Sequence, residues 1–130
     1  MEVIDKRISQ RRENFFFYKK TLKNIEGINL LEEPDEAYFS NHWLTTILID
    51  PVKTDKTREE LQIALEKENI ESRPLWKPMH QQPVFSSSPS YLNGTSDELF
   101  SKGLCLHSGS NMSDEDRERV LNAIVKFLTK

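Results

Sequence analysis

Asn41-His-Trp-Leu-Thr-Thr-Ile-Leu-Ile-Asp50 is the stretch on which the fold prediction rests. It is rich in β-branched residues and is followed by Pro51, which predicts a β-strand over residues 41–50. Its apolar side chains fall on both faces of such a strand, so we expect the strand to lie in the middle of its sheet. The sequence on either side should then supply the neighbouring strands.

Shorter strand patterns occur on both sides of this stretch. Residues 28–31 and 37–40 flank the turn sequence Glu-Glu-Pro-Asp and predict two short strands. Residues 70–73 and residues 104–107 (Leu-Cys-Leu-His) predict two more. The central strand, the helix that follows it and the strand at 70–73 together give a β-α-β-like order.

Helices are predicted from apolar spacing and from capping residues. The first covers about 25 residues, where apolar positions three, four and seven apart form one stripe and Gly27 is the stop signal. Residues 57–69 begin with a Thr-x-x-Glu capping box. A short helix is capped by Thr95 or Ser96, and Ser113 caps the last one, whose first turn is acidic.

The composition excludes several classes of protein. Four glycines form neither a Walker A loop nor a G-x-G-x-x-G fingerprint, and one cysteine excludes a disulfide framework and a Cys-rich zinc site. A net charge of −3 argues against a dedicated nucleic-acid binder. No apolar run approaches the roughly 20 residues that span a bilayer. We therefore expect a globular cytoplasmic domain without nucleic-acid, membrane or metal partners.

No catalytic constellation emerges from the reactive residue types. Cys105 lies between two leucines on a predicted strand, where a buried and inert thiol is expected. The three histidines have no recognised metal-ligand spacing with it or with one another. The paired carboxylates at residues 59–60 and 114–116 fall in the first turns of helices, where they complement the helix dipole. The sequence thus predicts no catalytic residue and no metal ligand.

Residues 74–94 are the irregular part of the chain and hold four of its six prolines. A loop this long in a compact domain is functional or disordered, and its aromatic residues favour a function. Cationic and aromatic side chains here suit a phosphorylated, ring-containing ligand, although a structural loop with solvated charges explains them equally well. The side chains that carry this chemistry are Trp76, Lys77 and His80 in this segment and Arg73 directly before it.

Three stretches together resemble the C-terminal part of the DegT/DnrJ/StrS sugar aminotransferases. They are Asn41-His-Trp-Leu-Thr-Thr, residues 71–85 (ESRPLWKPMHQQPVF) and residues 99–116 (LFSKGLCLHSGSNMSDED). The resemblance covers essentially the whole chain, and the run SRPLWKPMH is its most specific part. Within the family, the chain looks most like the branch that aminates UDP-linked 4-keto-6-deoxy sugars, which includes the bacillosamine-pathway enzymes.

The resemblance implies both a fold and a chemistry. The fold is α+β, a small and mostly antiparallel sheet with helices on one face, like the C-terminal small domain of aspartate-aminotransferase-like (fold type I) enzymes. The chemistry is pyridoxal phosphate (PLP)-dependent transfer of an amino group from glutamate to the C4 ketone of a UDP-sugar, in a homodimer. It also implies that Arg73, Trp76, Lys77 and His80 face the substrate; Lys77 does not match the motif of the PLP lysine.

Two departures from the family pattern limit what the resemblance implies. The family's Schiff-base lysine and cofactor-binding residues belong to an N-terminal large domain. We therefore expect residues 1–26 to be the linker helix from that missing domain and residues 27–130 to be the small domain. The chain alone is then expected to bind no PLP and to be inactive. His107 stands where the family has Pro in Leu-Cys-Leu-Pro-Ser-Gly, which argues against a catalytic role for it.

Two other classes of function stay open. A stand-alone ligand-binding or regulatory module would bind a small ligand tightly by itself. A protein-interaction domain would use the aromatic cluster Phe15-Phe16-Phe17-Tyr18, because four consecutive aromatic residues cannot all face one core. Polar replacements in that cluster would then leave a soluble monomer.

Overall fold

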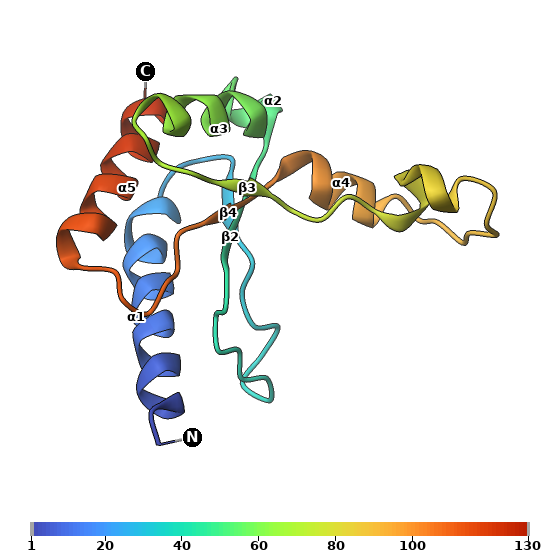
Figure 1. Ribbon diagram of the computed structural model, residues 1–130. Helices are drawn as coiled ribbons and strands as arrows, with labels where there is room; N and C mark the ends of the chain where they lie inside the picture. Colours follow the sequence, from blue (N-terminus) through green and yellow to red (C-terminus); the bar gives the residue numbers. More distant parts are fainter. Residues whose placement is uncertain (1, 130) are drawn as a thin grey trace.

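The sheet has four strands in the order β1-β2-β4-β3 in this computed structural model, which describes residues 2–129 (Figure 1). Every neighbouring pair is antiparallel. β2 therefore has a partner on each side, as the apolar residues on both of its faces predicted. The strands are β1 Ile28–Leu30, β2 Thr45–Ile49, β3 Arg73–Pro74 and β4 Gly103–Leu106.

The helices begin close to the predicted capping residues. Capping boxes form at Thr57 and Ser113, where the hydroxyl accepts a backbone N–H and the acidic side chain three residues on accepts the N–H of the cap. Gly94 caps the short fourth helix, so the prediction of Thr95 or Ser96 is wrong. The elements are α1 Ile4–Leu22, α2 Pro51–Thr54, α3 Arg58–Lys67, α4 Thr95–Lys102 and α5 Asp114–Leu128, with short 3-10 helices η1 Met79–Gln81 and η2 Pro83–Phe85.

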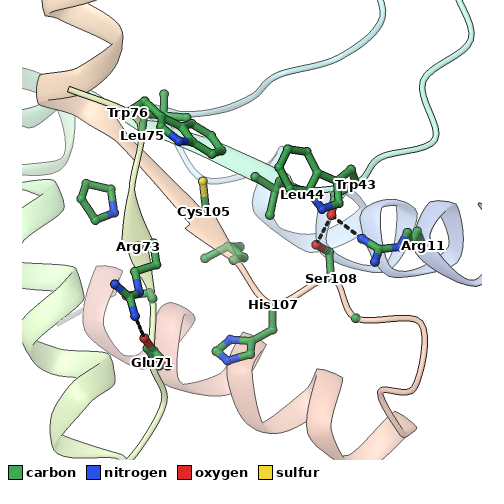
Figure 2. A pocket seen from close by; sticks show the side chains of 14 residues that line it. Arg11, Trp43, Leu44, Glu71, Arg73, Leu75, Trp76, Cys105, His107 and Ser108 are labelled. Atoms are coloured by element: carbon green, nitrogen blue, oxygen red, sulfur yellow. Dashed lines mark hydrogen bonds and ion pairs between the residues drawn. The ribbon is translucent and has the colours of Figure 1, made fainter. Parts of the chain in front are cut away.

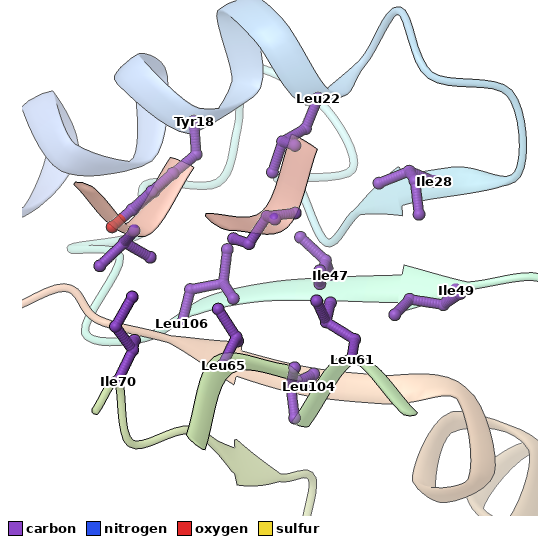
Figure 3. Packing of buried hydrophobic residues seen from close by; sticks show 12 residues of the cluster. Tyr18, Leu22, Ile28, Ile47, Ile49, Leu61, Leu65, Ile70, Leu104 and Leu106 are labelled. Carbon is purple, nitrogen blue, oxygen red and sulfur yellow. The ribbon is translucent and has the colours of Figure 1, made fainter. Parts of the chain in front are cut away.

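A single apolar core lies between one face of the sheet and the helices α1, α3 and α5 (Figure 3). α4 contributes no buried residue to it. The antiparallel sheet with helices on one face confirms the α+β prediction. No helix within residues 2–129 is both long and apolar enough to cross a membrane. The helical side of the core consists of Tyr18, Leu22, Leu61, Leu65, Val120 and Ile124, and the strands add Ile28, Ile47, Ile49, Leu104 and Leu106.

The strand register decides which side chains reach the opposite face. Ile47 pairs with Leu104, and both point into the core. Side chains alternate between the two faces along a strand. In the next row across the sheet, Cys105 on β4 lies between Thr46 on β2 and Arg73 on β3, so these side chains point to the other face. This second face of the sheet carries the candidate site.

The strand predicted at residues 37–40 does not form. Side chains take the backbone groups that a neighbouring strand would need. Glu33 accepts a hydrogen bond from the N–H of Ser40 at 3.1 Å, and Arg12 donates to the carbonyl oxygen of the same residue. With its backbone satisfied by side chains, this segment becomes a loop against α1.

Two strands begin several residues later than predicted. β2 begins at Thr45, because His42 has a φ of 45° and cannot continue an extended strand. The strand predicted at 70–73 moves to Arg73–Pro74, where a proline is tolerated because β3 is an edge strand. β2 and β3 run parallel with β4 between them, so the β-α-β-like order forms as a split unit.

Three of the four consecutive aromatic residues of α1 pack inward. Phe15 and Tyr18 are buried, and Phe17 packs against the core. Phe16 is 47% exposed. One core therefore accommodates most of the cluster, and a single phenylalanine ring remains at the surface.

Candidate functional site

A cavity of about 760 Å³ lies against the second face of the sheet, where Cys105 and Arg73 point (Figure 2). This volume falls in the range of small-molecule sites. Its walls come from β3, β4 and the turn after β4, together with the segment before β2 and the N-terminal half of α1. The lining side chains that matter for chemistry are Arg11, Trp43, Arg73, Trp76, His107 and Ser108.

Two tryptophans face each other at this cavity. The ring centroids of Trp43 and Trp76 are 6.1 Å apart and the ring planes are tilted by 38°. Trp43 precedes β2 and Trp76 follows β3, and β4 lies between these two strands. The split strand order therefore brings together two rings that are far apart in the sequence.

The backbone of Trp43 is held by hydrogen bonds on both sides. Its carbonyl oxygen accepts from the guanidinium of Arg11 at 2.6 Å and from the hydroxyl of Ser108 at 2.8 Å. Its N–H donates to the side-chain oxygen of Asn41 at 2.9 Å. Ser108 is buried. The indole of Trp43 is therefore presented from a backbone fixed by α1, by the turn after β4 and by its own loop.

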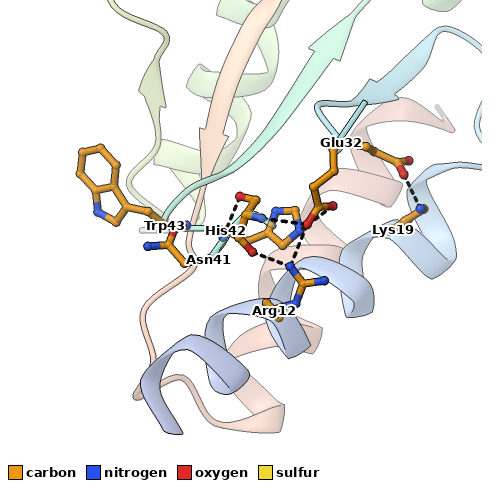
Figure 4. Close-up of polar contacts among 8 residues, drawn as sticks. Arg12, Lys19, Glu32, Asn41, His42 and Trp43 are labelled. Carbon is orange, nitrogen blue, oxygen red and sulfur yellow. Dashed lines mark hydrogen bonds and ion pairs between the residues drawn. The ribbon is translucent and has the colours of Figure 1, made fainter. Parts of the chain in front are cut away.

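His42, directly before this tryptophan, joins the loop to α1 (Figure 4). Its buried ring stacks on Phe15 with a centroid separation of 3.7 Å, and Nε2 lies 3.4 Å from Oε2 of Glu33 without a hydrogen bond. Burial lowers the pKa of His42 and outweighs the nearby Glu33 carboxylate. The side-chain hydrogen bond from Arg12, 2.7 Å long, lowers the pKa of Glu33 to about 2. A neutral imidazole thus lies beside an ionised Arg12–Glu33 pair.

Cys105 at the floor of the cavity is a poor nucleophile. Burial raises the pKa of its thiol, and only a weak contact of 4.0 Å to the Thr46 hydroxyl opposes this. The prediction of a buried cysteine is confirmed. Within residues 2–129 no group of three His, Cys, Asp or Glu side chains could hold a metal ion.

Comparison with protein-family models matches residues 1–125 to the DegT/DnrJ/EryC1/StrS aminotransferase family. The chain belongs to this family. Among its relatives, EpsN of Bacillus subtilis (strain 168), provisionally named a pyridoxal phosphate-dependent aminotransferase, is 37% identical over 129 residues, which cover 96% of this chain and 32% of EpsN. The GDP-perosamine synthase of Escherichia coli is 29% identical over 127 residues, or 98% of this chain and 33% of that protein.

Solved aminotransferase structures share the fold. The structure of DesI with its TDP-sugar product has a TM-score of 0.86 and 23% identity, covering 99% of this chain and 33% of DesI. S. venezuelae DesV in complex with a ketimine intermediate has a TM-score of 0.84 and 19% identity, covering 99% of this chain and 34% of DesV. The chain spans about a third of the length of these relatives.

The four substrate-binding residues predicted for this DegT/DnrJ/EryC1/StrS chain fall into two pairs. Arg73 and Trp76 line the cavity. Lys77 and His80 do not line it. Lys77 is exposed near the start of the loop formed by residues 74–94, which projects from the rest of the domain. Nε2 of His80 lies 2.8 Å from Oδ1 of Asp97 in α4.

Figure 1 shows that this loop projects from the rest of the domain. The contact between His80 and Asp97 fixes the base of the loop. Gln81 also donates to Asp97, and the hydrogen bonds from Gln81 and His80 hold the pKa of this carboxyl below its usual value. His80 therefore anchors the loop to α4, while the loop residues beyond it are mostly exposed.

Sequence reasoning missed Arg11, Trp43 and Ser108. Arg11 carried no signal of its own in the first predicted helix, and Trp43 fell within the strand predicted at residues 41–50. Their hydrogen bonds span 32 and 65 residues of sequence, so no local pattern could reveal them. Among residues 2–129 no lysine lines the cavity, so these lining residues do not fit an anchoring site for the family's PLP.

Proposed function

We propose that this chain is the substrate-facing small domain of a PLP-dependent nucleotide-sugar aminotransferase. Residues 1–26 would be the linker helix from a large domain and residues 27–130 the small domain. The observation that carries the proposal is the cavity on the second face of the sheet, where exposed indole rings and arginine side chains meet in a member of this aminotransferase family. Aromatic rings and guanidinium groups are the partners that a nucleoside diphosphate needs.

The proposed reaction moves an amino group from glutamate to the C4 ketone of a UDP-linked 4-keto-6-deoxy sugar. A nucleotide-linked sugar is supported by the names of the relatives, one a GDP-perosamine synthase and one solved with a TDP-sugar product. The choice of UDP rests on the resemblance of the three stretches quoted in the sequence analysis to the branch of the family that aminates UDP-linked sugars. This substrate would place the enzyme in the biosynthesis of an amino-sugar polysaccharide or glycan in the cytoplasm.

The proposed roles of the four predicted residues follow from their positions. Arg73 is mostly exposed and pairs with Glu71, a surface pair that is weak in water and can give way to a phosphate. Trp76 offers a ring face, and Lys77 is an exposed cation on the adjoining loop. His80 would contribute by holding that loop against Asp97.

The cofactor and the second subunit belong to the rest of the proposed enzyme. PLP would supply the electron sink for amino transfer, and a lysine outside this chain would anchor it. No lysine in the described part of the chain lines the cavity, which supports this division. The chain alone should therefore be inactive, and a homodimer that includes the large domain should be the active form.

A chimaera tests the proposal. The segment of EpsN that aligns with this chain is replaced by residues 1–130, and the purified chimaera is assayed with glutamate and UDP-, TDP- or GDP-linked 4-keto-6-deoxy sugars. We expect amino-sugar formation that is fastest with the UDP sugar, and none from the 130-residue chain alone. A folded, PLP-loaded chimaera that aminates none of the three would refute the proposal, and a preference for TDP or GDP would refute the choice of UDP.

A further inference from the structure

Trp43 and Trp76 are the two tryptophans of the chain, and the fold brings both to one cavity. They are 59% and 66% exposed, so two large apolar rings face solvent side by side. Aromatic rings left open in this way at a cavity mark a surface that a ligand can cover. Figure 2 shows the rings above Cys105, with Arg11 on one side and Arg73 on the other.

Both rings are attached to backbone that is already fixed. Trp43 is held through its carbonyl oxygen by Arg11 and Ser108. Trp76 follows Leu75, whose N–H donates to the carbonyl oxygen of Gly103 at 3.2 Å and so continues the pairing of β3 with β4. The side chain of Leu75 also packs directly against Gly103. A Cβ added at Gly103 would lie only 2.2 Å from Cδ1 of Leu75, so the leucine fills that space. A ligand that stacks here therefore has little protein ordering to impose, which favours binding.

The charges around the rings suit an anion. Arg11 and Arg73 line the cavity against one carboxylate, Glu71. Arg73 is paired with Glu71, but Arg11 has no ion-pair partner among residues 2–129 and gives its hydrogen bond to a neutral carbonyl. A guanidinium has five N–H donors, so Arg11 keeps its charge and further donors for a phosphate.

We infer that Trp43 and Trp76 form the platform on which the base ring of the nucleotide sugar stacks, with the diphosphate directed to Arg11 and Arg73. The inference rests on the proposed function, and it adds Trp43 and Arg11 to the substrate site. A planar base can lie across two neighbouring rings, and base–aromatic stacking tolerates any base because every base has a π face. Binding of the diphosphate then accounts for the two arginines that lie beside an otherwise apolar surface.

Intrinsic fluorescence reads this platform without a label, because all indole emission of the chain comes from these two residues. The 130-residue chain is titrated with UDP, uridine, inorganic pyrophosphate and glucose 1-phosphate. We expect UDP and uridine to quench the tryptophan emission, and pyrophosphate and glucose 1-phosphate to leave it unchanged. UDP should bind more tightly than uridine, and its affinity should fall as the salt concentration rises. No quenching by millimolar UDP, or quenching by glucose 1-phosphate in place of uridine, would overturn the assignment of the base.

Substitutions assign the effect to the two rings. Trp43→Ala and Trp76→Ala should each raise the UDP dissociation constant about tenfold, the loss expected for one stacking ring, while Trp→Phe should restore most of the affinity. Tyr91→Ala is the matched control, because Tyr91 is a fully exposed ring on the projecting loop. Far-UV circular dichroism verifies folding. Unchanged UDP affinity in the folded double variant Trp43→Ala/Trp76→Ala, measured by calorimetry, would overturn the inference.

The EpsN chimaera separates this inference from the proposed function. If the chimaera aminates a nucleotide sugar and the two tryptophan variants leave its KM unchanged, the function stands and the platform is refuted. If UDP quenches the emission in a tryptophan-dependent way but no chimaera transfers an amino group, the platform stands and the proposed function is refuted. We expect the variants to raise KM for the nucleotide sugar with little change in kcat, because the base lies away from the reacting carbon.

Discussion

Ser108 donates a hydrogen bond of 2.8 Å to the backbone oxygen of Trp43, which lies 65 residues earlier in the chain. This single contact ties the turn after β4 to the loop before β2. Arg11 donates to the same oxygen from α1, so three distant segments meet at one carbonyl group. The position of the Trp43 ring is thus a property of the tertiary fold.

Removing the Ser108 hydroxyl should loosen this junction. We expect Ser108→Ala to lower the free energy of unfolding by about 1 kcal/mol, because a buried hydrogen bond is lost while Arg11 still satisfies the carbonyl. In a Trp76→Phe background, where all indole emission comes from Trp43, the variant should also increase quenching by acrylamide. Urea unfolding and fluorescence measure both effects. Ser88→Ala, at an exposed serine, is the control, and equal behaviour of the two variants would contradict the role of Ser108.

Tyr18 offers a substitution that should stabilise the protein. Its side chain is fully buried in the core, its hydroxyl has no hydrogen-bond partner among residues 2–129, and burial raises its pKa far above the usual value (Figure 3). Tyr18→Phe keeps the packed ring and removes the uncompensated polar atom, so we expect the free energy of unfolding to rise by about 1 kcal/mol. Tyr38→Phe, at a tyrosine that is 61% exposed, should change nothing. A loss of stability in Tyr18→Phe would show that the hydroxyl has a partner.

Acidification should weaken the junction between the loop and α1 through His42. The pKa of buried His42 is lower than the usual 6.5, so the unfolded chain takes up this proton more readily than the folded one. The neutral imidazole of His42 contributes its full stabilisation of the folded state above pH 6.5. This contribution decreases as the pH falls towards the pKa of His42 in the folded protein. Glu33, whose pKa is about 2 against the usual 4.5, loses its contribution only at lower pH.

A pair of histidine variants isolates this effect. His42→Phe retains a ring against Phe15 and removes the titrating group. It should therefore flatten the dependence of the unfolding free energy on pH between about pH 7 and about pH 5. His107→Gln, at an exposed histidine, should leave the slope as it is. If the slopes of the wild type and His42→Phe coincide, His42 does not control this window.

Local signals made much of the fold predictable. The capping boxes at Thr57 and Ser113 depend on residues three apart, and the central place of β2 follows from its own apolar faces. The strand predicted at residues 37–40 was wrong because Glu33 and Arg12, outside that segment, satisfy its backbone. Local propensity yields to such tertiary contacts.

The candidate site was predictable only in part. Trp76 belongs to a loop whose composition already suggested a ligand, Arg73 comes directly before that loop, and both line the cavity. Trp43 joins them because β4 inserts between β2 and β3, an order that no residue spacing reveals. Whether Lys77 and His80 contact substrate stays a prediction.

Covalent trapping of PLP tests the proposal that the lysine that anchors the cofactor lies outside this chain. The purified chain is incubated with PLP and reduced with borohydride, and the adducts are located by mass spectrometry. We predict scattered, substoichiometric labelling of surface lysines, because none of the lysines that the structure describes lines the cavity. A single stoichiometric adduct, above all at Lys77, would show that the chain builds its own PLP site and would contradict its assignment as a small domain without the cofactor amine.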